Sequence, residues 1–126
     1  MKTPDDLQYT KEHEWVQIIG DDVTFGITDF AQDALGDIVF ISLPKVGEEI
    51  SAGDTCGEVE STKSVSDIFA PVSGIVTEVN SALTANPEVI NADPYQAGWM
   101  VKVKVSGQLE AADFLSAADY QTFTEG

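Results

Sequence analysis

Hydrophobic and β-branched positions gather in short runs along the first part of the chain, and small polar residues separate the runs. Two such runs cover residues 15–19 and 23–27, and Gly20-Asp21-Asp22 between them has the composition of a tight turn. The pattern therefore predicts that the fold opens with a β-hairpin.

A short helix is predicted next, over residues 30–35. Thr28 or Asp29 can accept hydrogen bonds from its first free amides, and Gly36 can end it because glycine tolerates a positive φ. Residues 38–43 are then predicted to form a buried strand, which the following proline stops.

Glycine and proline interrupt residues 44–105 so often that only short strands fit between them. The interrupting residues are Gly47, Gly53, Gly57, Pro71, Gly74, Pro87, Pro94 and Gly98. This spacing is typical of a barrel or a sandwich, so we expect a mainly β fold.

The clearest two-residue period lies at the end of this region. It places Trp99, Val101, Val103 and Val105 on one face, against Met100, Lys102 and Lys104 on the other. We therefore expect both lysines to be solvated strand residues.

A closing helix is predicted over residues 110–123. Phe114, Ala117, Ala118 and Gln121 recur there at helical spacing. We expect this helix to cover one side of the sheets, with Tyr120 and Phe123 in the core.

Length and charge narrow the possible functions. The chain has 126 residues, enough for one domain, and its 22 acidic side chains face 6 lysines and no arginine, for a net charge of −16. Such a protein lacks the clustered cations that bind nucleic acid or anionic membranes. Its acidity favours basic surfaces on other proteins, or serves solubility in a salty environment.

Cysteine use and the N-terminus add little chemistry. Cys56 is the only cysteine, so no internal disulfide forms, and we expect it to be a small buried hydrophobe. The first nine residues carry Asp5 and Asp6 and no apolar run, which is unlike a secretory or transit segment. A cytoplasmic location is predicted.

The candidate chemistry lies on a lysine. Phosphate-binding glycine loops and nucleophile elbows are missing from the sequence, whereas Lys63 lies in a small polar segment between two β-prone runs. This predicts a hairpin with Thr62-Lys63 at its tip. Because β-branched Thr62 resists positive φ, a type I turn is favoured, and we expect the tip to project and hold the lysine away from the body. Gly53 and Gly74 flank the lysine at nearly equal distances, so strands of similar length fit on each side.

An ordered set of short segments resembles the H protein of the glycine cleavage system, a lipoyl carrier family. The matching segments are His13-Glu14-Trp15, Gly26-Ile27-Thr28-Asp29, Ala34-Leu35-Gly36-Asp37-Ile38-Val39-Phe40, Glu60-Ser61-Thr62-Lys63-Ser64, Ser66-Asp67, Pro71-Val72-Ser73-Gly74, Glu78-Val79-Asn80, Pro94-Tyr95 and Gly98-Trp99-Met100. They follow the family order from about residue 9 to residue 105.

The resemblance implies a single domain over residues 1–126, with a hairpin core at about 44–105 and the closing helix at about 110–123. Its fold would be a flattened barrel-sandwich hybrid of the lipoyl and biotinyl carrier type, with a short internal helix and a C-terminal helix. Lipoate would be joined to Lys63 through an amide, and the chain would carry and shield its cargo without catalysing a reaction.

The same resemblance implies the partners. A pyridoxal-phosphate glycine decarboxylase would load an aminomethyl group onto the arm, a folate-dependent aminomethyltransferase would unload it, and dihydrolipoyl dehydrogenase would reoxidise the dithiol. A lipoate-attaching enzyme would modify the lysine beforehand.

Three acidic residues are carried over from the family. Glu14 and Asp67 match positions that hold the loaded arm, and Glu60 resembles a position that helps the lipoate-attaching enzyme select Lys63. By composition alone, Glu14 and Asp67 are expected to be solvated acids, and Glu60 a strand-edge charge that discourages aggregation. Three residues depart from the family pattern. Thr62 stands where the family usually has valine, Ser64 where alanine is common, and Glu12 where a small hydroxyl residue is frequent.

Three other functions remain open from the residues. A lipoyl domain of a 2-oxo-acid dehydrogenase complex would share the hairpin but is usually shorter and continues into a linker. An unmodified acidic scaffold would not need Lys63 at all. A Schiff-base lyase would need a lysine of lowered pKa, yet Glu58, Glu60 and Asp67 lie close to it in the sequence and favour the protonated amine.

Overall fold

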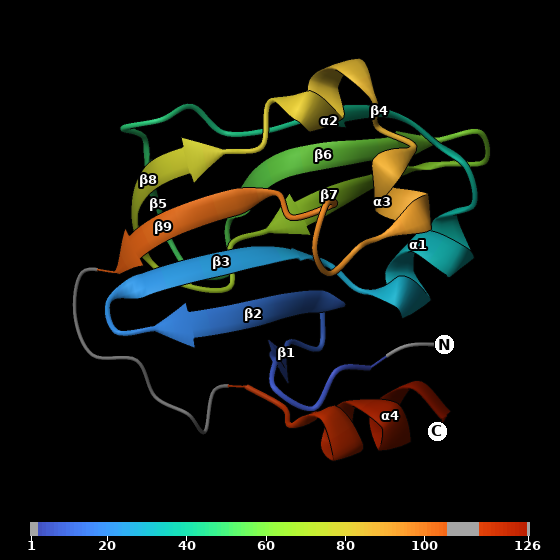
Figure 1. Ribbon diagram of the computed structural model, residues 1–126, viewed down its shortest axis with the longest axis horizontal. Helices are drawn as coiled ribbons and strands as arrows, with labels where there is room; N and C mark the ends of the chain where they lie inside the picture. The colour runs from blue at the N-terminus through green and yellow to red at the C-terminus, as the bar shows by residue number, and fades with distance from the viewer. Residues whose placement is uncertain (1–2, 106–113, 126) are drawn as a thin grey trace.

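Two antiparallel sheets make up most of the protein. The computed structural model describes residues 3–105 and 114–125, and within them a six-stranded sheet has the order β1-β2-β3-β9-β8-β5 while a three-stranded sheet has the order β4-β6-β7. Figure 1 shows the two sheets stacked, with α1 and α3 at the end of the molecule where the β6–β7 hairpin turns. The expected mainly β fold with few helices is confirmed.

The bounds of the strands and helices follow the chain. The strands are β1 (Gln8–Tyr9), β2 (Glu14–Ile19), β3 (Asp22–Ile27), β4 (Ile38–Ser42), β5 (Glu49–Ile50), β6 (Thr55–Ser61), β7 (Val65–Phe69), β8 (Gly74–Val79) and β9 (Val101–Val105). The helices are α1 (Asp29–Leu35), α2 (Ala82–Ala85), α3 (Val89–Ala92) and α4 (Ala117–Glu125).

The hairpin and the short helix predicted before residue 37 are confirmed. β2 and β3 pair as a hairpin from Glu14↔Ile27 to Ile19↔Asp22. The side chain of Thr28 caps α1 by accepting a hydrogen bond from the Ala31 amide at 3.1 Å. Gly36 ends the helix at φ 84°, a value that only glycine adopts without strain.

The main hydrophobic core lies between the two sheets, and a second, smaller hydrophobic cluster lies beside it. Phe25, Val59, Ile68 and Met100 are among the fully buried side chains of the main cluster. The second cluster forms where α4 meets the N-terminal strands, and its members are Leu7, Tyr9, Trp15, Ala117 and Tyr120. Burial of these apolar surfaces is the main favourable contribution to folding.

Two strand predictions need correction. The strand after α1 is expected to be buried, but Val39 and Phe40 of β4 are largely exposed. Phe40 lies on the solvent-facing side of the three-stranded sheet, and the register of β4 is irregular between Ile38 and Phe40. The alternation of buried and exposed residues is expected from residue 99 onward, but it begins only at Val101. Met100 is fully buried and does not share a solvated face with the two lysines.

The closing helix is shorter than predicted. It covers Ala117–Glu125, Phe114 precedes it outside any helix, and residues 110–113 of the predicted span lie outside the described residues. Its buried residues are Ala117 and Tyr120, whereas Phe123 is 41% exposed. The helix packs beside β1 at the edge of the large sheet and does not lie across a sheet face (Figure 1).

Candidate functional site

Lys63 lies at the tip of the β6–β7 hairpin, as predicted. The Ser61 amide donates to the Ser64 carbonyl at 2.8 Å, and the Ser61 hydroxyl oxygen accepts from the Lys63 and Ser64 amides at 3.1 Å each. Neither tip residue has a positive φ, so the predicted absence of a primed turn is confirmed. The serine side chain supplies the turn closure that glycine or asparagine usually provides.

The hairpin tip contacts the C-terminal end of α1, and this contact is not predicted from the sequence. The Thr62 amide donates to the Asp37 carbonyl at 3.0 Å. A Cβ placed on Gly36 would come within 3.0 Å of the Lys63 Cε, so the lysine stem lies close to the glycine backbone. The expectation that the hairpin holds its lysine away from the body is therefore wrong for the stem.

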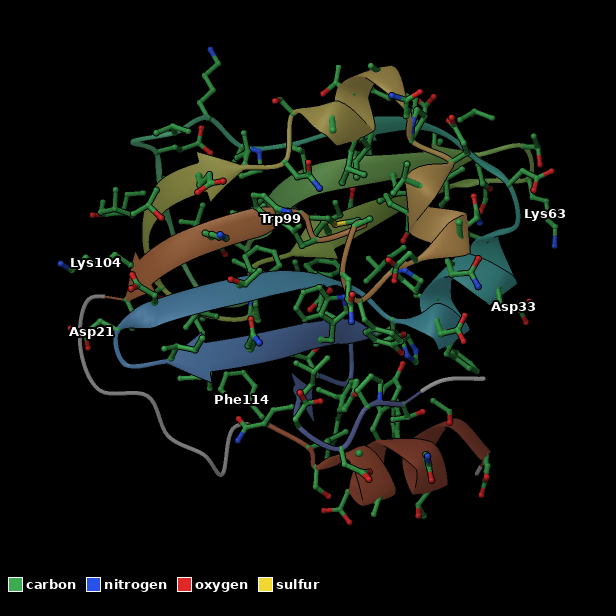
Figure 2. The ribbon with its side chains drawn as sticks, in the orientation of Figure 1. Asp21, Asp33, Lys63, Trp99, Lys104 and Phe114 are labelled. Carbon is green, nitrogen blue, oxygen red and sulfur yellow. The ribbon has the colours of Figure 1, made fainter. Side chains whose placement is uncertain are left out.

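The amine itself is accessible. Lys63 is exposed and forms no ion pair within residues 3–105 and 114–125. Figure 2 shows its side chain at the outer end of the molecule, near α1 and its labelled residue Asp33, with the nitrogen pointing away from the ribbon. An enzyme can therefore reach the amine without opening the fold.

A cleft runs beside α1 and has a volume of about 230 Å³. Most of its lining is apolar, and three acids, one histidine and one serine complete it: Glu12, His13, Glu14, Ile27, Phe30, Ala31, Ala34, Leu35, Val59, Ser66, Asp67 and Ile68. The helix thus connects the two features, because its C-terminal end touches Lys63 and its length borders the cleft.

Two of the three predicted acids line this cleft, and they differ sharply. Glu14 is 2% exposed, and Thr10 donates a hydrogen bond to its Oε1 at 2.8 Å. Burial raises the pKa of Glu14 to about 8, although hydrogen bonds from Thr10 and the Phe69 backbone oppose the rise. The expectation of a solvated acid is wrong for Glu14. It holds for Asp67, which is exposed on β7.

Glu60 lies elsewhere. It is half-buried on β6, where it pairs with Phe40 of β4 and Val65 of β7, and the cleft lining does not include it. The structure thus brings Glu14 and Asp67 together and places Glu60 on the strand that leads to the lysine.

His13 belongs to the cleft wall and was not predicted as a site residue. Its ring stacks on Phe30 with centroids 4.7 Å apart, and its Nδ1 lies 2.8 Å from the Tyr120 hydroxyl. Tyr120 in turn lies 2.8 Å from the Thr28 hydroxyl that caps α1. Burial lowers the pKa of His13. The C-terminal helix therefore fixes both the histidine and the start of α1.

A second, larger hollow lies on the outer face of the six-stranded sheet. Its volume is about 660 Å³, and Trp99, Lys102 and Thr24 are among its lining residues. The Lys102 ammonium lies 5.0 Å from the Trp99 ring centroid and 3.8 Å from a Glu78 oxygen, so this lysine is already partnered. None of the predicted site residues lines this hollow.

The predicted cysteine environment is partly confirmed. Cys56 is free and half-buried, and it packs against the main core. Burial raises the pKa of its thiol to about 12, which keeps it in the unreactive protonated form.

Comparisons of the sequence and of the fold with known proteins point to the same family. The sequence matches the family model described as Glycine cleavage H-protein over residues 7–126. A glycine cleavage system H protein of Beutenbergia cavernae is 55% identical over 126 residues, which is 100% of this chain and 99% of that protein. The one of Mycobacterium avium (strain 104) is 58% identical over 128 residues, covering 97% of each chain.

A solved structure agrees with the sequence matches. The crystal structure of a glycine cleavage system H protein from Mycobacterium marinum has a TM-score of 0.89 and 47% identity, covering 98% of this chain and 99% of that chain. Within the described residues, no helix is long and apolar enough to cross a membrane.

The buried Glu14 carboxyl should make stability depend on pH. The pKa of Glu14 is about 8 in the folded protein and 4.5 in its ordinary, unburied state. The contribution of the carboxyl to the free energy of unfolding is therefore full below pH 4.5 and is lost as the pH rises through 8. The free energy of unfolding of the parent protein should therefore fall with rising pH, while that of Glu14→Gln does not share this loss. We expect the stability of Glu14→Gln relative to the parent to increase by on the order of 3 kcal/mol from pH 5 to pH 8.5, as measured by urea unfolding. Glu88→Gln, an exposed acid outside the cleft lining, serves as the control and should leave the pH dependence unchanged. Parallel stability curves for the parent and Glu14→Gln would contradict a buried neutral carboxyl.

Proposed function

We propose that this chain, which belongs to the glycine cleavage H-protein family, carries its lipoyl group as an amide on Lys63. Its role is that of a lipoyl carrier in the glycine cleavage system, a role supported by high identity along the whole chain. The single observation that carries the assignment to Lys63 is its exposed amine, unpaired within the described residues, at the tip of a closed hairpin.

The residues around the lysine fit a lipoyl arm. When bound, lipoate supplies a disulfide that can be reduced and can accept a one-carbon unit. An extended arm of lysine and lipoate spans roughly 14 Å. The seven residues of α1 span about 10 Å at 1.5 Å per residue. An arm that starts beside Gly36 is therefore long enough to follow the helix into the cleft.

The lining of the cleft suits both parts of such an arm. Ala31, Leu35 and Val59 offer apolar contact to a saturated carbon chain, and burying that chain is favourable by roughly 25 cal/mol per Å². Glu14 and Asp67 offer carboxyl oxygens to a cationic cargo. We propose that these two acids hold the aminomethyl ammonium and that the cleft keeps water from it.

Glu14 also sets a condition on loading. Its carboxyl is mostly protonated at neutral pH, because burial raises its pKa to about 8. An ammonium group beside it would favour the carboxylate, so the carboxyl proton would leave as the cargo settles. A charge-assisted hydrogen bond of this kind contributes roughly 1.5–3 kcal/mol when partly desolvated.

The partners follow from the assignment to the glycine cleavage system. We propose four: a pyridoxal-phosphate glycine decarboxylase, a folate-dependent aminomethyltransferase, dihydrolipoyl dehydrogenase and a lipoate-attaching enzyme. The chain itself would bind, orient and shield, while the enzymes that it visits would supply the chemistry. We propose one carrier domain for the chain, and the cytoplasmic location stays a prediction.

Modification of Lys63 can be tested by intact mass. Co-expression with a lipoate-attaching enzyme and lipoate should add one lipoyl group to the parent protein and none to Lys63→Arg. Lys104→Arg is the matched control, since Lys104 is also an exposed lysine but lies within strand β9, and this variant should still be lipoylated fully at Lys63. A parent protein that stays unmodified, or a Lys63→Arg variant that still gains the group, would overturn the assignment.

The two acids can be tested by the lifetime of the loaded arm. Glu14→Gln and Asp67→Asn should each shorten the lifetime of the aminomethyl cargo at least about tenfold, measured as ammonia or formaldehyde release, without stopping lipoylation. The ratio between parent and Glu14→Gln should grow from pH 6.5 to pH 8.5, because only the ionised Glu14 attracts the cation. Glu88→Gln, an exposed acid outside the cleft lining, is the control. Equal lifetimes in all four proteins would exclude this role for the two acids.

A further inference from the structure

The outer face of the three-stranded sheet carries exposed apolar side chains close to Lys63. Phe40 of β4 is 48% exposed and Val65 of β7 is 58% exposed. Both pair directly with Glu60 of β6, so the three side chains form one row across the sheet on the same side. Val39, placed beside them by the irregular register of β4, is also exposed.

The opposite face of the same sheet shows that this row is not core. The neighbouring row Ile41–Val59–Ser66 points inward, with Ile41 3% exposed and Val59 1% exposed. Since successive strand residues point to opposite faces, the Phe40–Glu60–Val65 row faces solvent. Exposed apolar side chains grouped in this way mark interaction sites more often than scattered ones do.

We infer that Phe40 and Val65, which flank Glu60 in this row, form an apolar docking surface for the lipoate-attaching enzyme, which would present an apolar patch edged by lysine or arginine. This inference rests on the proposed function and extends it to the partner's contact surface. It concerns the two apolar residues, to which neither the sequence nor the comparisons assign a role.

The short distance between this row and Lys63 favours the lipoate-attaching enzyme over the other three proposed partners. Val65 and Glu60 lie two and three residues from Lys63, about 7 to 10 Å along their strands. A lysine side chain alone extends only about 6 Å, so an enzyme that acylates its amine must contact the hairpin surface around the tip. Enzymes that act on the far end of a roughly 14 Å arm do not need this row.

Charge supports a basic partner. The next row on the same face is Ser42–Glu58–Asp67, so carboxylates border the apolar pair. The whole chain carries a charge of −16, which attracts a basic surface and accelerates its encounter. A second copy of this chain would oppose its own carboxylates to the same row, which disfavours self-association there.

The test compares lipoylation kinetics of surface variants with an ATP-dependent lipoate-attaching enzyme and free lipoate. Phe40→Thr/Val65→Thr places strand-favouring, β-branched threonine in both strands and should lower kcat/KM at least tenfold, chiefly by raising KM, since Lys63 is unchanged. Ile19→Thr is the matched control, because Ile19 is 67% exposed at the end of β2 in the other sheet, and it should stay within twofold. A double variant that also stays within twofold would overturn the inference.

Two further measurements separate the alternatives. After prolonged incubation has lipoylated every variant, reduction by dihydrolipoyl dehydrogenase should be equal within twofold, and a loss in this step in place of the first would assign the row to another partner and overturn the inference. Thermal unfolding checks the fold. If the double variant melts early, the near-isosteric Val65→Thr alone should still lower kcat/KM at least threefold, and no loss would overturn the inference. A parent protein that accepts no lipoate would instead refute the proposed function itself.

Discussion

The contact between the hairpin tip and the end of α1 determines where the functional lysine stands. The Thr62 amide binds the Asp37 carbonyl at 3.0 Å, and the Lys63 stem lies against Gly36, which has no side chain to block it. Without this contact, a hairpin closed only by Ser61 would leave the lysine free to point anywhere around its tip. Because of this contact, the Lys63 side chain lies at the C-terminal end of α1, the helix that borders the cleft.

The cleft depends on contacts that are distant along the chain. Tyr120 of α4 bridges His13 and Thr28, and thereby connects the C-terminal helix to the cap of α1 and to one wall of the cleft. His13 itself has a φ of 67°, a conformation that a non-glycine residue holds only where its surroundings impose it. The hydrogen bonds and the Phe30 ring supply that restraint.

Much of the fold could be predicted because its signals are local. Thr28 and Gly36 mark the ends of α1 by capping chemistry, and the residues around Lys63 predict a hairpin tip without glycine. The burial of Glu14 could not be predicted, since it depends on packing among segments remote in sequence. The exposure of Phe40 likewise depends on which strand β4 pairs with and on the irregular register there, and an apolar run does not reveal either. The tip contact with Gly36 and the Tyr120 bridge join residues far apart in sequence, and they have no signature in a single sequence.

The central claim is that an arm on Lys63 lies along α1 in the cleft when it carries its cationic cargo. It is tested most directly by isotope-filtered nuclear Overhauser measurements on the loaded, lipoylated protein. The account predicts contacts from the arm methylenes to the Ala31 and Ala34 methyl groups, which line the cleft. Contacts confined to residues beside the hairpin tip, with none to either alanine, would contradict it.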